Sequence, residues 1–312
     1  MTDTAMAPCL VGVDVGGTKI EAALVVGDGD VAATARVPAR RGEDKVVEDV
    51  VAIVRDVAGA RTTDVVAVGI GIPGQVDAAT GRVANVVNLD IESLELAACV
   101  GARLGVPVHV ENDVNAAALG AARMLADVPG EGGGTAGPVA LLNFGTGLAA
   151  GLIVDGRLHH GYSGAAGEIG HIPIDPNRFD CPCGQRGCLE TVCSGASVAR
   201  LWPTLDGRPA MPDLIVQAAQ GEPEACRVLG MVKHAIGDAI QIVAQSVDPR
   251  MIVLGGGMAR TGEPLLRIIG DELRFRESGC PFLAGLRLKE RLRLAPVDAP
   301  LGALGAALAA RP

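Results

Sequence analysis

Aromatic side chains are scarce in this sequence. Only 2% of the 312 residues are Phe, Tyr or Trp, while 49% are hydrophobic and 43 are glycine. The core must therefore be built from Val, Leu, Ile and Ala, with glycine allowing close approach of backbones. This composition is typical of a tightly packed α/β protein. The length allows one large or two medium domains, each with its own core.

An excess of basic residues is also missing. The chain has 27 Lys and Arg against 36 Asp and Glu, which gives a formal net charge of -9. Binding to a phosphate backbone needs clustered Lys and Arg, so we expect no nucleic-acid partner. A small anionic substrate is still compatible with this charge, because backbone amides alone can hold it.

Targeting and membrane-spanning segments are absent from the sequence. No apolar run reaches the roughly 18 residues needed to cross a bilayer, so we expect no membrane partner. The start, MTDTAMAPCL, has no basic region of a secretory signal peptide and contains Asp3. Eight cysteines without such a signal indicate reduced thiols and metal binding, not a disulfide framework. We therefore expect a cytoplasmic protein.

The two most common nucleotide-binding motifs do not occur. There is no GxxxxGK[ST] loop and no GxGxxG run that opens a helix. Three other glycine turns follow predicted strands: Gly16-Gly17-Thr18, Gly145-Thr146-Gly147 and Gly255-Gly256-Gly257. Each turn alone is more typical of a plain hairpin. Three at wide separation, with Asp14 before the first, indicate loops that bind nucleotide phosphates through backbone N–H groups, and the third suits an adenine or ribose.

A nucleotide held in this way transfers its γ-phosphoryl group mainly through positioning and charge stabilisation. We expect ATP as the donor, with Mg²⁺ bridging phosphate oxygens. Asp14 is the natural carboxylate on the metal side, acting through water. Lys19 is either a cation that neutralises developing charge or a solvated strand lysine, and the sequence does not decide between them.

A hydroxyl acceptor needs a carboxylate base within hydrogen-bond reach, and the segment VENDVNAAALG offers Asp113. This residue follows a predicted strand and opens a predicted helix. An Asp at such a position is usually a helix N-cap, and spacing alone favours the cap. The three glycine turns shift our interpretation of Asp113 toward catalysis.

The segment HIPIDPNRFDCPCGQRGCLE places His171 ahead of Cys181, Cys183 and Cys188. One nitrogen and three sulfurs suit tetrahedral Zn²⁺, and four protein ligands leave no open position for chemistry. A structural zinc therefore fits this segment better than free cysteines or a redox dithiol does. We interpret the remaining cysteines as small buried hydrophobes: Cys9, Cys99, Cys193, Cys226 and Cys280.

Two glutamates, Glu168 and Glu190, flank the predicted zinc ligands. The metal loop would bring both of them to the ring of His171. A histidine that binds zinc through one nitrogen presents the other as a fixed N–H donor. His171 can therefore hold the metal and face a substrate hydroxyl at once.

Seven segments together resemble the ROK family (repressors, open reading frames and sugar kinases), within the hexokinase, actin and Hsp70 fold group. They are DVGGTK at 14–19, GIPG at 71–74, ENDVNAAALG at 111–120, GTG at 145–147, AAGEIGH at 165–171, CPCGQRGCLE at 181–190 and VLGGGM at 253–258. The segments cover nearly the whole chain, and the cysteine segment is the most specific. In addition, DVGGTK aligns with NFGTGL as a second hairpin turn, which favours an internal duplication.

The resemblance implies a fold and a domain division. The fold is a two-lobed, actin-like (ribonuclease H-like) α/β ATPase fold with a cleft between duplicated domains. We expect an N-terminal lobe over residues 1–112, with the C-terminal helix at about 299–312 packed on it. A C-terminal lobe over 113–298 would carry the zinc loop and the nucleotide site. We expect a homodimer or homotetramer.

The same resemblance implies an ATP-dependent sugar 6-kinase, in the first instance a glucokinase. Asp113 would take the proton from the sugar's 6-hydroxyl. The sugar pocket would further contain Gly74, Asn112, Glu168, His171 and Glu190. The phosphate loops would be formed by Gly16, Gly17, Thr18, Gly145, Thr146 and Gly147, and the adenosine loop by Gly255 and Gly256.

Alternatives of two kinds remain. Asn88-Leu89 is kept, but the Pro-Gly-Trp that often follows in glucokinases of the family is missing, which leaves kinases of N-acetylmannosamine, N-acetylglucosamine or fructose open. A transcriptional regulator or non-catalytic sugar sensor is disfavoured, because about nine residues precede the first strand and Asp113 is present. A zinc-ribbon interaction module would leave the three glycine turns unexplained.

Overall fold

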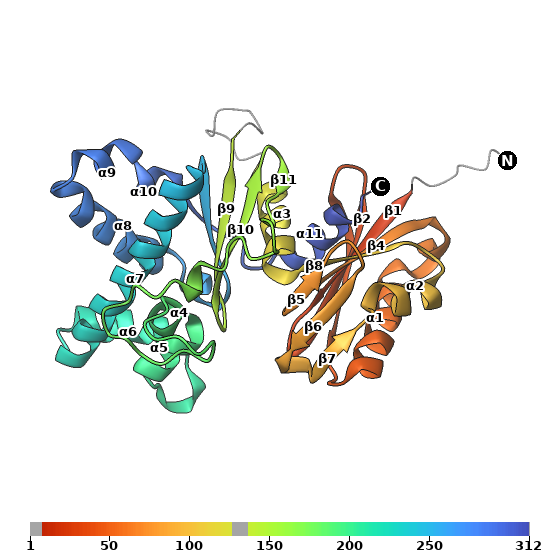
Figure 1. Ribbon diagram of the computed structural model, residues 1–312, viewed down its shortest axis with the longest axis horizontal. Coiled ribbons are helices and arrows are strands. Elements are labelled where there is room, and N and C mark those ends of the chain that lie inside the picture. Colours follow the sequence, from red (N-terminus) through yellow and green to blue (C-terminus); the bar gives the residue numbers. More distant parts are fainter. Residues whose placement is uncertain (1–7, 127–136, 312) are drawn as a thin grey trace. The chain divides into compact units, whose positions relative to one another are not determined.

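The computed structural model describes residues 8–126 and 137–311 and divides into two compact units (Figure 1). The first unit contains the described residues up to 126, Tyr162–Gly164 and the chain from Asp298 onward. The second contains residues 137–161 and Ala165–Val297. The boundary expected from the sequence, after residue 112, falls inside the first unit, at the junction of a strand and a helix that follow each other directly.

A five-stranded sheet forms the centre of the first unit, in the order β3-β2-β1-β4-β8. The neighbouring strands β1, β4 and β8 run parallel, and the pairs β1–β2 and β2–β3 are antiparallel. The strands are β1 (Cys9–Val15), β2 (Lys19–Val26), β3 (Asp30–Pro38), β4 (Val65–Ile72) and β8 (Val108–Asn112). A smaller antiparallel sheet follows β4 and comprises β5 (Gln75–Asp77), β6 (Arg82–Val86) and β7 (Ile91–Leu94).

The second unit repeats this design with the strand order β11-β10-β9-β12-β13. Its strands are β9 (Val139–Phe144), β10 (Leu148–Val154), β11 (Arg157–Leu158), β12 (Met251–Gly255) and β13 (Leu292–Leu294). Again the three strands on one side are parallel and the two on the other antiparallel. The turns β1–β2 and β9–β10 therefore occupy equivalent places, which confirms the predicted duplicated α/β architecture.

Alternating side chains give the first sheet two different faces. Val11, Val13 and Val15 of β1 are fully buried in a cluster with the helix α1 (Glu43–Ala58). The alternate residues Leu10 and Gly12 face the C-terminal helix α11 (Leu301–Ala309), as the period of two along a strand requires. The helices α2 (Leu96–Leu104) and α3 (Asp113–Leu125) complete this unit, with the 3₁₀ turns Gly59–Asp64 and Val87–Leu89.

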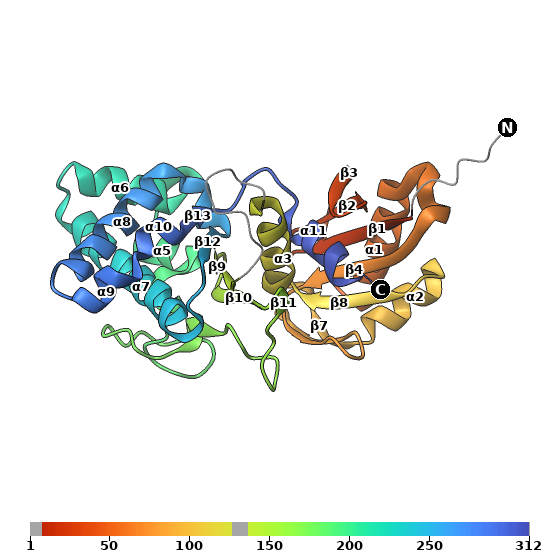
Figure 2. The same ribbon diagram turned by 90° about the horizontal axis from the view of Figure 1, so that it is seen from above.

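Glycines let α11 approach the sheet and α3 at backbone distance (Figure 2). A Cβ atom at Gly12 would lie 1.7 Å from the carbonyl oxygen of Ala303, and one at Gly69 only 1.8 Å from that of Ala306. On the other side of α11, a Cβ at Gly305 would lie 1.6 Å from the carbonyl oxygen of Ala116 in α3. This packing explains why α3 belongs to the first unit.

Helices surround the sheet of the second unit. They are α4 (Glu190–Cys193), α5 (Gly195–Leu201), α6 (Ala210–Ala219), α7 (Pro223–Val247), α8 (Glu263–Ser278), α9 (Pro281–Leu286) and α10 (Leu288–Arg291). The 3₁₀ turns are Ile169–His171, Leu205–Gly207 and Gly257–Thr261. Leu142 and Phe144 of β9 pack with Ile236 and Ile240 of α7 and with Ile269 of α8. None of the described helices combines the length and apolar character of a membrane span.

The close packing of α11 predicts opposite effects for two Gly→Ala substitutions. Gly305→Ala should lower the free energy of unfolding by about 1–3 kcal/mol, because the added methyl group overpacks a backbone contact. Gly230→Ala in α7 meets no atom within 4 Å. It should raise stability by roughly 0.5–1 kcal/mol through helix propensity. Thermal midpoints from calorimetry would measure both changes, and a Gly305→Ala protein as stable as the wild type would contradict this packing.

Candidate active site and metal centre

The first glycine turn closes the hairpin between β1 and β2. The N–H of Gly16 donates to the carbonyl oxygen of Lys19 at 2.9 Å, and the backbone around Gly17 runs directly past the side chain of Asn88. Thr18 and Lys19 are exposed. Lys19 forms an ion pair with Glu21 at 3.6 Å, with 47% of its side chain accessible. These contacts are those of a solvated strand lysine, which is one of the two roles expected for Lys19.

Asp14 stands at the end of β1, on the face that α11 covers. A Cβ atom at Gly302 would lie 2.6 Å from Cγ and from Oδ2 of Asp14, so any side chain at position 302 would displace the carboxyl group. Burial raises the pKa of Asp14 to about 7, and the negative charges of Asp113 and Glu21 add to this rise, against the opposing effect of Lys19. Asp14 and Asp113 are thus close enough to influence each other electrostatically.

Asp113 is the first residue of α3, but it is not the helix cap. Asn112 is the cap, because its side chain accepts hydrogen bonds from the N–H groups of Val114 at 2.9 Å and Asn115 at 3.3 Å. The buried Glu111 supports the junction, accepting from the N–H of Asn112 at 2.8 Å and from Nδ2 of Asn115 at 3.0 Å. The cap position that sequence spacing favoured for Asp113 is therefore filled by its neighbour.

Gly74 lies between β4 and β5 in the first unit. Its φ of 97° falls in the left-handed region. A Cβ atom there would also lie 2.8 Å from the carbonyl oxygen of Ala84. Both facts require glycine at this position. The first unit thus contains Asp14, Gly16, Gly17, Thr18, Lys19, Gly74, Asn112 and Asp113 of the predicted site residues.

The second unit brings its two glycine turns together. Gly255, the last residue of β12, pairs with Asn143 of β9, just before the Gly145–Gly147 turn. Gly256 has a φ of 77°, and a Cβ atom there would lie 2.4 Å from the carbonyl carbon of Phe144. The predicted phosphate loop and the predicted adenosine loop are therefore in direct backbone contact. Asn143, which belongs to none of the three glycine turns, lies where two of them meet.

The three predicted sugar ligands of the second unit come from two short helical turns. Glu168 immediately precedes the 3₁₀ turn that ends at His171, and residues three apart lie on the same side of such a turn. Glu190 begins α4, and its Oε2 accepts a hydrogen bond from the N–H of Leu148 at 2.9 Å. A Cβ at Gly147 would lie 2.4 Å from that Oε2, so Gly147 leaves room for the carboxylate beside the phosphate turn.

The four predicted zinc ligands converge. One ligand atom from each of His171, Cys181, Cys183 and Cys188 lies within 4.8 Å of all the others. Nδ1 of His171 is 3.8 Å from Sγ of Cys181, and the Sγ atoms of Cys183 and Cys188 are 3.7 Å apart. Thiolates bound at about 2.3 Å to a tetrahedral zinc ion are about 3.8 Å apart, so the donor set and its spacing fit Zn²⁺.

Comparison with known proteins decides the family. The model of the ROK family matches residues 10–275. A glucokinase from Streptomyces coelicolor is 34% identical over 276 residues, covering 82% of this chain and 84% of that protein. The chain belongs to the ROK family.

Two solved ROK structures are similar over almost the whole chain. The ROK hexokinase from Thermus thermophilus has a TM-score of 0.77 at 29% identity and covers 97% of both chains. A ROK family glucokinase from Streptomyces griseus, solved with glucose and AMPPNP, has a TM-score of 0.75 at 31% identity, covering 97% of this chain and 99% of that one. The predicted actin-like ATPase fold of the ROK kinases is thereby confirmed.

The thiols of this ROK protein differ in their environments. Hydrogen bonds from the backbone and side chain of Gln185 lower the pKa of the exposed Cys183 to about 6, whereas burial raises that of Cys188 to about 12. Outside the cluster, Cys9 and Cys193 are buried as predicted, and Cys99 and Cys280 are partly buried. Cys226 is exposed, which corrects its interpretation as a buried hydrophobe, because it lies on the outer side of α7.

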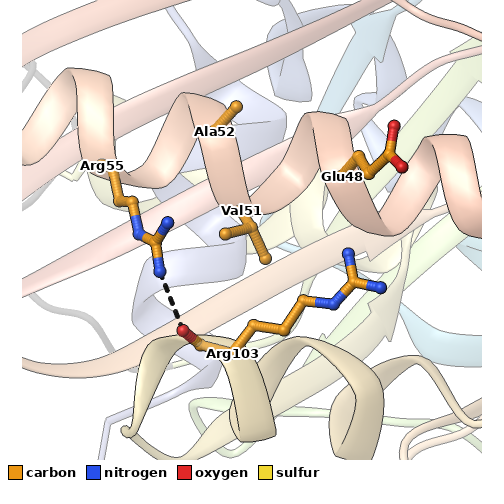
Figure 3. Close-up of a pocket in the computed structure, with 5 residues that line it drawn as sticks. All are labelled: Glu48, Val51, Ala52, Arg55 and Arg103. Carbon is orange, nitrogen blue, oxygen red and sulfur yellow. Dashed lines mark hydrogen bonds between the residues drawn. The ribbon is translucent and has the colours of Figure 1, made fainter.

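The first unit also has a hollow on its surface (Figure 3). It has a volume of about 420 Å³ and is lined by Glu48, Val51, Ala52, Arg55 and Arg103 of α1 and α2. Arg55 donates a hydrogen bond to the backbone oxygen of Arg103 at 3.0 Å. Since none of the predicted site residues lines it, the hollow has no part in the candidate site.

The raised pKa of Asp14 predicts a pH dependence of stability. The folded protein without nucleotide keeps this carboxyl group protonated up to about pH 7, whereas the ordinary value is 3.8. Between these values the folded state binds more protons, so the free energy of unfolding should fall as pH rises, by up to about 4 kcal/mol. Asp14→Asn removes this contribution. Its stability relative to the wild type should therefore rise between pH 4 and pH 8 in thermal unfolding.

The matched control for Asp14 is Asp271→Asn, at an exposed aspartate paired with Arg274 in α8. This variant should keep the wild-type pH profile. Parallel profiles for Asp14→Asn and the wild type would contradict the raised pKa.

The metal cluster predicts about one zinc ion per chain in the purified protein. Cys183→Ser should lose both the metal and sugar binding, because three remaining ligands hold zinc weakly and the His171 loop loses its anchor. Cys226→Ser, at an exposed cysteine outside the cluster, should keep both. Metal analysis and calorimetric sugar titration would measure these effects. A zinc-free protein with normal sugar affinity would refute the role assigned to His171.

Proposed function

We propose that this protein is an ATP-dependent glucokinase that phosphorylates the 6-hydroxyl group of glucose. The observation that carries the proposal is the similarity to a glucokinase over 82% of the chain, together with an Asp113 that capping does not require. The S. griseus relative was solved with glucose and an ATP analogue, which supports the same pair of substrates here.

Asp113 has one step in the proposed reaction, the removal of a proton. Its carboxylate takes the proton of the 6-hydroxyl group while that oxygen attacks the γ-phosphorus, and the bond from the γ-phosphorus to the bridging oxygen breaks to release ADP. Fixed at the start of α3, with Asn112 and Glu111 holding the junction, Asp113 has a defined position for this transfer. Asn112 accepts the cap bonds through Oδ1, which leaves its Nδ2 group for a sugar hydroxyl.

The nucleotide is assigned to the glycine turns. Gly16, Gly17 and Thr18 and the Gly145–Gly147 turn would bind phosphates through backbone N–H groups, and Gly255 and Gly256 the adenosine part. Mg²⁺ bound with ATP would neutralise charge on the phosphates, and Asp14 would hold it through water. The contact between the Gly256 and Gly145 loops supports a single nucleotide spanning both.

The sugar pocket is assigned to side chains tied to the metal loop. Glu168, His171 and Glu190 would bind the remaining hydroxyls of the sugar. Because Nδ1 of His171 faces Cys181, its Nε2 is the nitrogen left to donate to a hydroxyl. A structural Zn²⁺ would thus position substrate and take no part in the transfer.

A second substrate class deserves a direct test. The missing Pro-Gly-Trp after Asn88-Leu89 leaves kinases of N-acetylglucosamine, N-acetylmannosamine or fructose open as alternatives. An ATP-coupled assay over these sugars and glucose should give the highest kcat/KM with glucose. The sequence-based expectations of a cytoplasmic location and a homodimer or homotetramer fit such an enzyme and remain proposals.

Asp113→Asn tests the proposed base directly. We expect kcat to fall by about 10³-fold or more, since the amide cannot accept the proton. KM for glucose and the thermal midpoint should change little, because the shape of the side chain is kept. Asp44→Asn, at an aspartate in the first turn of α1, should leave kcat unchanged. Wild-type kcat in Asp113→Asn would exclude the base, and no ATP-dependent phosphorylation of any sugar in the panel would exclude the kinase.

A further inference from the structure

Gln185 lies inside the metal loop without being a ligand. The loop is folded by a tight turn, in which the N–H of Cys181 donates to the carbonyl oxygen of Gln185 at 2.9 Å and the N–H of Gly184 donates to that of Cys181 at 3.0 Å. Gly184 has a φ of 90°, which lets the chain reverse between Cys183 and Gln185. The side chain of Gln185 is thereby returned to the sulfur cluster.

The amide nitrogen of Gln185 contacts three of the four ligand residues. Nε2 donates to the backbone oxygen of His171 at 3.0 Å. It is also 3.5 Å from Sγ of Cys183 and 3.7 Å from Sγ of Cys188, within the range of N–H···S hydrogen bonds. These three acceptors come from both ends of the loop, so one side chain connects the histidine segment to the cysteine segment.

The chemistry of the contact suits thiolate ligands. A glutamine amide offers two N–H donors and no positive charge. Metal-bound sulfurs carry negative charge, and N–H donors stabilise that charge and fix the direction of the ligand. We propose that Gln185 is a positioning residue of the metal centre, whose side-chain amide holds the Cys183 and Cys188 thiolates and the His171 main chain in the arrangement that binds Zn²⁺.

This inference rests on the zinc centre of the proposed function and deepens it. The neighbouring Arg186 shows that not every long side chain of the loop has this role. Arg186 is exposed and forms an ion pair through Nε with Oδ1 of Asp180 at 2.8 Å, a residue that is not a predicted metal ligand. It therefore provides the matched control within the same turn.

The test compares zinc affinity in Gln185→Met, Gln185→Glu and Arg186→Ala. Methionine keeps the length of the side chain but has no donor, whereas glutamate replaces the donor by a negative charge beside two thiolates. Competition with a chromophoric zinc chelator should show zinc affinity about 10-fold weaker or more for Gln185→Met, and weaker still for Gln185→Glu. Arg186→Ala should keep the wild-type affinity.

A second readout separates ligand positioning from general stability. In Co²⁺-substituted protein, Gln185→Met should shift the sulfur-to-cobalt absorption bands while Arg186→Ala leaves them unchanged. Wild-type zinc affinity and spectrum in both Gln185 variants would overturn the inference, as would a wild-type protein that binds no zinc. Glucose phosphorylation is assayed separately on the zinc-saturated proteins, so its failure would count against the kinase and not against Gln185.

Discussion

The chain between β11 and α4 depends on one interaction, the convergence of His171 with Cys181, Cys183 and Cys188. Over residues 159–189 the structure has a single 3₁₀ turn and few fully buried side chains, so hydrophobic packing alone offers little to offset the entropy of ordering it. A metal held by these four ligands would close this long loop at several points at once. The loop carries Glu168 and His171 and leads directly into Glu190. Without the cluster, three proposed sugar ligands would lose their fixed positions, so a metal bound here would serve the site without taking part in its chemistry.

In the first unit, the corresponding constraint is backbone packing. The glycines of β1, β4 and α11 exclude side chains from the contact, and the carboxyl group of Asp14 is confined against Gly302 as a result. The strand-to-helix junction adds a second constraint, because Asn112 satisfies the first N–H groups of α3 and Asp113 does not have to. Asp113 accepts one hydrogen bond from the N–H of Val114 at 3.0 Å, and its negative charge raises the pKa of Asp14.

Much of the fold and of the candidate site could be predicted from the sequence, but features that depend on three-dimensional packing could not. Strands, glycine turns and the zinc ligands are local patterns, so the duplicated sheets and the His–Cys cluster were predictable. The assignment of α3 to the first unit could not be predicted, because it depends on packing against α11, a helix from the far end of the chain. The role of Gly302 beside Asp14 depends on the same long-range contact. Cys226 was misjudged because hydropathy alone does not say which side of α7 faces outward. The contacts of Gln185 could not be predicted, because the spacing of the ligands says nothing about the residues between them.

The two equivalent hairpins differ in the charge of the side chain that precedes their glycine turns. Asp14 and Asn143 occupy equivalent positions, each two residues before the first glycine of its turn. A Cβ at Gly145 would lie 3.5 Å from Nδ2 of Asn143, so this amide lies beside the proposed phosphate turn. A carboxylate there would repel a polyphosphate, whereas a neutral amide can donate to it. At the first turn a carboxyl group is tolerated, because burial favours the neutral form of Asp14 in the protein without ligands. A bound cation would favour the charged form. The aspartate therefore suits the proposed contact with a cation, whereas the asparagine suits contact with the nucleotide phosphates.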